Sequence, residues 1–460
     1  MSVKHTLFRN AAVLTAAGII SRGLGFFFRI FLSHAFGEES VGLYQITFPL
    51  YALCLSVGTA GLQAAVSRIT AEKYALGKPD EAESILKTAL CLAVSISIVE
   101  ILLIQGNASR IAVSFLGDRR CRDLVLIISY ALPFAAVHSC ICGQSLGMQD
   151  TKLPAISQLI EQGARILSVF IVYALIRCLS GGQEFPSIRL AAAGIVAGEL
   201  AATAFSVRSL SLTRRRSLQR PCRPVRPAGS CIGRFRTALR ELLAFSLPLT
   251  ANRTALSLLQ SIEAASVPVC LQLYGMTSAE ALRTYGVMTG MALPCILFPS
   301  AVTGSVSTVL LPAVSAASTS GNRRSVLMLL RRSVLGCISV GMGCCLFFLI
   351  AGEWIGQFLF HSSDAGHFII TLAWICPFLY TNSALLSALN GCGRTGAAFG
   401  INMAGLLIRI AGVFLVIPRS GIQGWLWTLL ASQAVISALA FCALAVSDNI
   451  LKKRKEPPHQ

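Results

Sequence analysis

The first apolar stretch of the chain is long enough to cross a bilayer, yet it carries two arginines, Arg22 and Arg29. A charged side chain at bilayer depth costs about 2.5–3.5 kcal/mol on insertion scales. The two arginines are seven positions apart, so on a helix they share one face, roughly 10 Å apart. Guanidinium groups match phosphate oxygens with two parallel hydrogen bonds. The pair therefore predicts the binding of an anion rather than catalysis.

The composition is that of an integral membrane protein. Of the 460 residues, 54% are hydrophobic and 13% are charged, whereas a soluble domain has about 25% charged residues. The net charge of +19 is concentrated in connecting loops, as membrane topology requires, and we expect no nucleic-acid partner. We expect no cleaved signal peptide, because an arginine interrupts the first apolar segment.

The apolar stretches predict an all-α protein with about twelve transmembrane helices. The expected spans are 11–35, 43–66, 84–104, 123–147, 154–178, 188–212, 242–272, 285–312, 329–351, 366–390, 396–417 and 421–446. Several contain a proline near mid-depth, namely Pro49, Pro133, Pro248, Pro294, Pro299 and Pro377. In lipid such prolines are tolerated where neighbouring helices or a wet cavity satisfy the freed carbonyls. This pattern favours a transporter-like bundle.

Basic residues divide the chain and orient it. We expect an N-terminal six-helix lobe at 1–212, a basic cytoplasmic linker at 213–241, a C-terminal lobe at 242–447 and a basic cytoplasmic tail at 448–460. Because the basic loops fall on one side when every helix crosses, both termini are predicted to be cytoplasmic. The linker is interpreted as a charge block that sets topology, with a patch for anionic lipid or nucleic acid as the alternative.

The two halves of the chain repeat each other. Four matches share one offset of 244 residues, and they are Pro133 with Pro377, Gly147 with Gly391, Thr151 with Thr395, and Arg165 with Arg409. An even number of spans in each copy gives both lobes the same orientation. The repeat therefore predicts two lobes related by a pseudo-twofold axis along the membrane normal, around a central cavity that opens alternately to either side.

The repeat extends the set of candidate binding residues. Arg253 in the seventh span corresponds to the arginines of the first span and is expected to face the same seam as Arg22 and Arg29. Arg165 and Arg409 are expected either to line the cytoplasmic mouth of the cavity or to extend their charges to the membrane surface. A cavity lined by these groups would suit an anionic ligand.

Uncharged and acidic groups complete the candidate site. Asn252 is a candidate for sugar or backbone contacts, and Glu263 lies on the same helix as Arg253 and is a candidate counter-ion for it. In the alternative interpretation the arginines are structural and are paired with Glu161, Glu199 or Glu263. Neither a metal cluster, nor a catalytic triad, nor a Gly-x-x-x-x-Gly-Lys-Ser/Thr phosphate loop is visible. We therefore expect no enzyme, no metal and no cofactor.

Three segments resemble a known family. These are SRGLGFFFRI from Ser21 to Ile30, GLYQITFPLY from Gly42 to Tyr51, and TAGL from Thr59 to Leu62. They are similar to the stage V sporulation protein B group, which belongs to the polysaccharide-exporting flippases of the multidrug/oligosaccharidyl-lipid/polysaccharide superfamily. The resemblance implies two six-helix lobes and the flipping of undecaprenyl-pyrophosphate-linked sugars for spore cortex or other peptidoglycan assembly.

The chain departs from these relatives in two ways. Relatives of the group commonly carry two further C-terminal helices, whereas this chain ends after a basic segment, Lys452 to Lys455. Related lipid II flippases place arginines in the second and eighth helices, where this sequence has apolar and small residues. Binding of the anion is therefore expected to depend on Arg22, Arg29 and Arg253.

The expected function is that of an alternating-access flippase in the bacterial cytoplasmic membrane. Its partners would be a lipid-linked anionic sugar precursor and membrane lipids, with cell-wall synthases as further candidates, and we expect a monomer. The driving force is left open between a monovalent cation, the membrane potential and the substrate gradient. One alternative is a cation-coupled multidrug exporter, which requires carboxylates inside the membrane, here Glu100, Glu161, Glu199 and Glu263. The other is a non-transporting scaffold for cell-wall synthesis enzymes.

Overall fold

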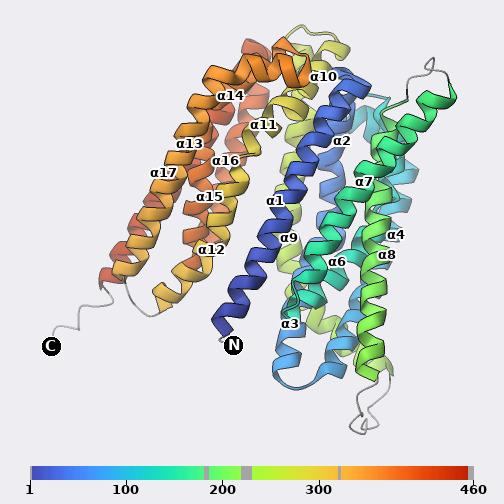
Figure 1. Ribbon diagram of the computed structural model, residues 1–460, viewed down its shortest axis with the longest axis vertical. Coiled ribbons are helices and arrows are strands. Elements are labelled where there is room, and N and C mark those ends of the chain that lie inside the picture. Colours follow the sequence, from blue (N-terminus) through green and yellow to red (C-terminus); the bar gives the residue numbers. More distant parts are fainter. Residues whose placement is uncertain (1–2, 181–185, 219–230, 320–322, 454–460) are drawn as a thin grey trace. The chain divides into compact units, whose positions relative to one another are not determined.

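The structure, a computed structural model, describes residues 3–180, 186–218, 231–319 and 323–453 (Figure 1). Side chains near the ends of these segments, at 3–11, 213–218 and 446–453 among others, lie outside the description. Within the described residues all regular structure is helical. This confirms the predicted all-α class.

The helices follow one another with short connections. In the first half they are α1 (Val3–Phe36), α2 (Glu38–Leu55), the π-helix η1 (Ser56–Ala60), α3 (Gly61–Ala75), α4 (Pro79–Arg110), the π-helix η2 (Ile111–Phe115), α5 (Cys121–Ser129), α6 (Leu132–Gly147), α7 (Lys152–Leu179) and α8 (Arg189–Leu218). In the second half they are α9 (Cys231–Leu273), α10 (Ser278–Gly286), the π-helix η3 (Val287–Ala292), α11 (Leu293–Leu297), α12 (Ser300–Thr319), α13 (Arg323–Phe360), α14 (Ser363–Ala373), α15 (Cys376–Gly391), α16 (Thr395–Leu415) and α17 (Ile417–Lys453).

The described helices provide enough apolar length for up to twelve membrane spans. Nine are individually long and apolar enough, and three further spans consist of bent helix pairs. Two of these pairs, α5 with α6 and α14 with α15, bend by 42° and 54°. Each bend falls where a proline, Pro133 or Pro377, occupies the first turn of the second helix. Proline is tolerated there because the first turn needs no N–H donor within the helix.

Two compact units make up the chain. The N unit comprises Met1–Gly25 with Leu43–Ser261, and the C unit comprises Phe26–Gly42 with Ile262–Gln460. Thus α1 and α9 each contribute residues to both units. The expected division at a linker, 213–241, stays a prediction, because much of it, like the end of the expected tail, lies outside the described residues.

The repeat found in the sequence reappears as the same packing inside each unit. The bounds of α6 and α15 differ by 244 residues at both ends. At the end of α6, a methyl group on Gly147 would lie 2.5 Å from the carbonyl oxygen of Ser67 in α3. At the end of α15, one on Gly391 would lie 2.9 Å from that of Leu311 in α12. Both glycines are required because helix backbones meet there without room for a side chain.

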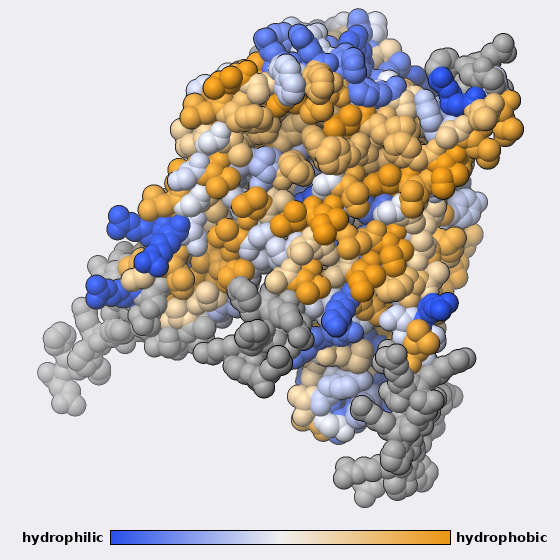
Figure 2. Space-filling model, viewed as in Figure 1, coloured by the Kyte–Doolittle hydropathy of each residue, from blue (hydrophilic) through white to orange (hydrophobic). Residues whose placement is uncertain are grey.

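Large apolar side chains cover the outer faces of the helices (Figure 2). Leu102 and Leu103 on α4 are 65% and 60% exposed, and Ile350 on α13 is 85% exposed. Soluble proteins rarely expose contiguous apolar surface on this scale. The surface is therefore suited to contact with lipid, in agreement with the predicted membrane spans.

Candidate functional site: a buried ionisable cluster in the N unit

Helix α8 packs closely against α7 because two of its residues have no side chain. A methyl group on Gly198 would lie 2.7 Å from the carbonyl oxygen of Glu161, and one on Gly194 would lie 3.2 Å from that of Arg165. Small residues spaced four apart are a common means of close helix approach in membranes. This approach brings Glu199, the residue after Gly198, next to the polar face of α7.

Glu199 is the centre of a buried polar cluster. Its side chain belongs to a residue only 6% exposed, and its Oε1 accepts a hydrogen bond of 3.2 Å from the hydroxyl of Tyr51 on α2. Its Oε2 has no hydrogen-bond partner among the described residues and lies 3.6 Å from Nδ1 of His138 on α6. The other ring nitrogen of His138 lies 3.0 Å from Oγ of Ser157 on α7. The imidazole therefore connects a hydroxyl group to a buried carboxylate.

A second carboxylate of the cluster is paired with an arginine. Arg165 Nη2 donates a hydrogen bond of 2.6 Å to Glu161 Oε1 across one turn of α7. The Nε atom of Arg165 is buried and has no hydrogen-bond partner among the described residues. The cluster thus contains one guanidinium, one imidazole and two carboxylates.

The geometry favours proton binding over metal binding. His138, Glu161 and Glu199 each offer one ligand atom, and these atoms lie within 4.8 Å of one another. However, the carboxylate of Glu161 is already bonded to Arg165, whose positive charge would repel a metal ion. The chemistry that remains is exchange of a proton between an imidazole and a carboxylate, and we assign no metal here.

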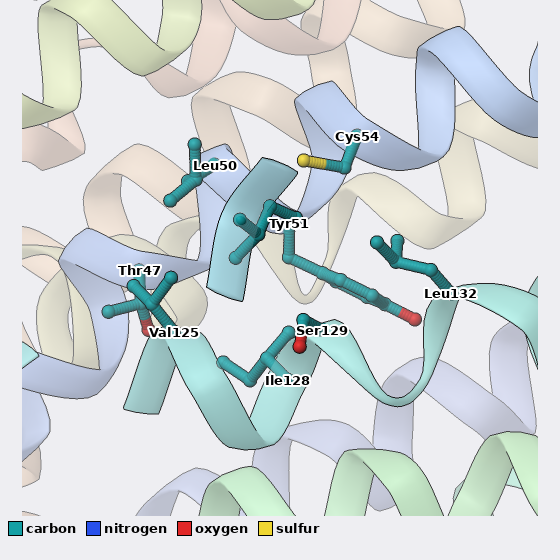
Figure 3. A pocket seen from close by; sticks show the side chains of 9 residues that line it. Thr47, Leu50, Tyr51, Cys54, Val125, Ile128, Ser129 and Leu132 are labelled. Atoms are coloured by element: carbon teal, nitrogen blue, oxygen red, sulfur yellow. The ribbon is translucent and has the colours of Figure 1, made fainter. Parts of the chain in front are cut away.

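A pocket of about 250 Å³ adjoins this cluster (Figure 3). Its lining residues come from α2, α4, α5 and α6, and they are Thr47, Leu50, Tyr51, Cys54, Ile104, Val125, Ile128, Ser129 and Leu132. Tyr51 belongs both to the pocket wall and to the cluster, because its hydroxyl, on the Leu132 side of the pocket in Figure 3, bonds to Glu199. The pocket is mostly apolar, and Tyr51 links it to the buried carboxylate.

The C unit contains an arginine pair of a different kind. Arg409 on α16 donates a hydrogen bond of 2.8 Å from Nε to Oε1 of Glu263 on α9, and its Nη2 forms an ion pair of 2.7 Å with Oε2. Glu263 is only 3% exposed. The expectation that Glu263 is the counter-ion of Arg253 is wrong, because both of its oxygens are occupied by Arg409. The fork of the guanidinium matches the carboxylate, so the pair is closed and electrically neutral.

The position that corresponds to His138 in the C unit is Asn382, 244 residues later. Asn382 Nδ2 donates hydrogen bonds to the backbone oxygen and to Oε1 of Gln433 on α17, at 3.0 and 2.8 Å. Ser437 Oγ donates one of 2.7 Å to Asn382 Oδ1. In the N unit, His138 and Glu199 connect the bent pair α5–α6 to α8. In the C unit, Asn382 and Gln433 connect the bent pair α14–α15 to α17. The first contact contains ionisable groups and the second contains amides.

The predicted binding residues fall into two groups. Arg165 and Arg409 are paired with glutamates, as the structural alternative predicted. Arg22 and Arg253 are exposed, and neither makes a hydrogen bond or ion pair with any described residue, although each lies well inside an apolar helix. The alternative that the arginines are structural and paired with buried glutamates therefore does not hold for Arg22 and Arg253.

Two further members of the predicted set lie apart from the buried cluster. Asn252 is exposed, next to Arg253 on α9. Arg29 is partly exposed and belongs to the C unit, whereas Arg22 belongs to the N unit. That Arg22, Arg29 and Arg253 face one chamber stays a prediction.

Sequence reasoning did not include His138 among the candidate binding residues. The repeat carried a usable signal, because the offset of 244 residues places a histidine in the first copy opposite an asparagine in the second. A position that changes from an amide to an ionisable group between two copies of one unit indicates a difference in chemistry. Its partner, Glu199, was considered as a counter-ion for an arginine and as a carboxylate of a cation-coupled multidrug exporter.

The helices and their bent pairs define a multi-pass membrane protein with a transporter fold. The structure matches an inward-facing multidrug resistance MATE family transporter of the MOP superfamily with a TM-score of 0.73, at 13% identity, over 95% of this chain and 96% of that chain. It matches lipid II flippase MurJ in an inward closed conformation with a TM-score of 0.71, at 14% identity, over 95% of this chain and 89% of that chain. At these identities the matches establish the fold.

The chain belongs to the polysaccharide biosynthesis protein family, whose model matches residues 7–318. Among characterised relatives, stage V sporulation protein B of Bacillus subtilis (strain 168) is 28% identical over 448 residues, which is 95% of this chain and 83% of the relative. The resemblance inferred from the first sixty residues is thereby confirmed. The chain is a multi-pass membrane protein of bacterial type.

Proposed function

We propose that this protein is a flippase that moves an undecaprenyl-pyrophosphate-linked sugar, a precursor of peptidoglycan, spore cortex or another polysaccharide, from the inner to the outer leaflet. It would work by alternating access in the bacterial cytoplasmic membrane, with both termini cytoplasmic. Family membership and the similarity to stage V sporulation protein B support this reaction class.

The observation that carries the proposal is the pair of unpartnered arginines. Arg22 and Arg253 are exposed and make no bond with any described residue, within helices that are otherwise apolar. A guanidinium in this setting requires water or an anion, because an unpaired charge in hydrocarbon is costly. A pyrophosphate that crosses the membrane has the same free-energy cost, because it too is a charge in hydrocarbon. Pairing of the guanidinium with the pyrophosphate would lower this cost for both groups.

The test is transbilayer movement of a fluorescent undecaprenyl-pyrophosphate-linked disaccharide in proteoliposomes that contain the full-length protein. We expect Arg22→Ala and Arg253→Ala each to slow movement at least tenfold, and lysine at either position to restore part of it, since lysine keeps the charge but not the fork. Arg110→Ala is the matched control, because Arg110 is also exposed and lies at the end of α4. Equal losses in all three alanine variants would contradict the assignment.

The two alternatives give different results in the same system. A multidrug exporter would move cationic dyes, and its activity would depend on membrane carboxylates rather than on Arg22 and Arg253. The paired state of Glu161 and Glu263 speaks against that function, because both carboxylates are already bonded to arginines. A scaffold for cell-wall synthases would move neither probe.

A further inference from the structure

We propose that His138 and Glu199 of the N unit form an exchangeable proton site, and that a proton bound there is the co-ion that drives transport. The coupling to transport rests on the flippase function proposed above. The site itself does not, because it follows from the charges and geometry of the cluster.

The charges of the cluster do not balance without a proton. Arg165 contributes one positive charge, whereas Glu161 and Glu199 contribute two negative charges when both are ionised. Of the cluster's side chains, only the imidazole of His138 is able to supply a second positive charge. Since an uncompensated charge in a protein interior is strongly unfavourable, the cluster requires one proton, held by His138 or by Glu199.

The position of Glu199 shows where this proton goes. The residue is 6% exposed, and its Oε2 atom points toward His138 Nδ1 at 3.6 Å without a hydrogen bond to any described residue. A small rotation of either side chain closes this gap. The transfer moves one proton from Nδ1 to Oε2, so the imidazolium becomes a neutral imidazole and the carboxylate becomes a carboxylic acid. No other covalent bond changes.

The titratable and polar groups around the pair come from α2, α6 and α7. They are Tyr51 on α2, Cys142 on α6, and Ser157, Glu161 and Arg165 on α7, with Tyr44 on α2 interacting with Arg165. On α5, Asp123 is paired at 2.6 Å with Arg189 in the first turn of α8. Arg165 is thus the permanent cation of the cluster, and its hydrogen bond occupies Oε1 of Glu161, whereas Oε2 of Glu199 faces His138 Nδ1 without a hydrogen bond to any described residue. We therefore assign the proton exchange to Glu199 and His138.

A path to the pair is provided by hydroxyl groups. Tyr51 donates to Glu199 from the wall of the 250 Å³ pocket (Figure 3), and Ser157 lies 3.0 Å from the far nitrogen of His138. Hydroxyl groups both donate and accept, so they are able to pass a proton. The pair is therefore buried and, on the Tyr51 side, still connected to the pocket.

The C unit supplies the design of the decisive variant. Its corresponding contact joins Asn382 to Gln433 at 2.8 Å and carries no ionisable group. The double variant His138→Asn with Glu199→Gln gives the N unit the same chemistry, with side chains of similar shape that still form hydrogen bonds. The single variants Glu199→Gln and His138→Gln separate the contribution of the carboxylate to the proton site from that of the imidazole. Glu353→Gln is the matched control, because Glu353 is an exposed glutamate on α13.

The site itself is tested by infrared titration of carboxyl groups in the purified full-length protein. We expect one protonatable carboxyl group to disappear in Glu199→Gln and in the double variant, to titrate at a different pH in His138→Gln, and to remain unchanged in Glu353→Gln. Circular dichroism and thermal unfolding confirm that each variant is folded. An unchanged titration in folded Glu199→Gln overturns the proton site.

The coupling is tested with the fluorescent lipid in proteoliposomes under an imposed pH gradient. A cycle that exchanges one proton for one lipid shifts the distribution of the lipid toward the acidic side by up to about tenfold for each pH unit. We expect this shift in the wild-type protein and in Glu353→Gln, and its loss in the double variant. A shift that persists in the double variant, or one produced only by a sodium gradient, overturns the coupling. Absence of movement under every condition, with the infrared titration intact, contradicts the flippase function and leaves the proton site standing.

Discussion

The two units place an arginine at corresponding positions and use it differently. In the N unit Arg165 makes one hydrogen bond to a glutamate on its own helix, and a second carboxylate and a histidine lie beside the pair. In the C unit Arg409 contacts both oxygens of a single glutamate on another helix, one through a hydrogen bond and the other through an ion pair. The Arg409–Glu263 pair is electrically neutral, whereas the cluster around Arg165 requires one more proton. Duplication of a six-helix unit has thus produced one copy whose buried contacts are static and one whose buried contacts are able to change charge.

The contact between Asn382 and Gln433 supports the same distinction. Both copies have a polar contact between a bent span and a later span, and in the C unit amide groups form it without an ionisable side chain. The histidine and glutamate of the N unit are therefore what distinguishes the two contacts.

The largest effect is expected when an arginine is removed from either unit. Arg409→Ala leaves Glu263 buried without a partner and should cost about 3–5 kcal/mol of stability, measured by thermal unfolding in detergent. Arg165→Ala should cost a similar amount at neutral pH, but acid should restore part of it, because protonation of two adjacent carboxylates removes their repulsion. The unfolding temperature of Arg165→Ala, relative to wild type, should therefore rise more steeply on acidification than that of Arg409→Ala. Parallel curves would contradict the difference between the units.

A smaller effect is expected when α7 and α8 are forced apart. The added methyl group in Gly198→Ala would lie 2.7 Å from the carbonyl oxygen of Glu161, so the helices must separate. The cost should be about 1–3 kcal/mol, and the infrared signal of Glu199 should shift as its surroundings change. Gly163→Ala on α7 is the control, because an added methyl group there has no neighbour within 4 Å among the described residues. If both variants behaved alike, the close approach would not be what positions Glu199.

The smallest effect compares one buried tyrosine in each unit. Tyr51 donates to a carboxylate, Glu199, whereas Tyr380 donates at 2.8 Å to a backbone carbonyl, that of Ile296. Hydrogen bonds to charged groups contribute about 1.5–3 kcal/mol and neutral ones about 0.5–1.5 kcal/mol. Tyr51→Phe should therefore be more destabilising than Tyr380→Phe by about 1 kcal/mol at neutral pH, as measured by thermal unfolding. Equal losses of stability in the two variants would assign the effect to packing.

Much of the architecture was predictable from local properties of the sequence. Apolar stretches of about twenty residues identify membrane spans because bilayer thickness sets their length, and the structure provides up to twelve such spans. Proline positions indicated the bends in two of the bent pairs, since proline removes a backbone donor. The offset of 244 residues predicted the repeat, and matching helix bounds confirm it. The arginines inside apolar spans were equally visible, because their cost depends only on composition.

The choice of partners was decided by the tertiary structure alone. Glu263 binds Arg409, 146 residues away, instead of Arg253 on its own helix. Glu199 lies beside Glu161 because two glycines allow α8 to approach α7, and His138 meets it from α6. Such pairs depend on which helix faces meet and on distances of a few tenths of an ångström, which neither hydropathy nor spacing along one helix specifies. Sequence determined that charges lie within the membrane, and only packing between helices decided which of them are neutralised and which remain able to exchange a proton.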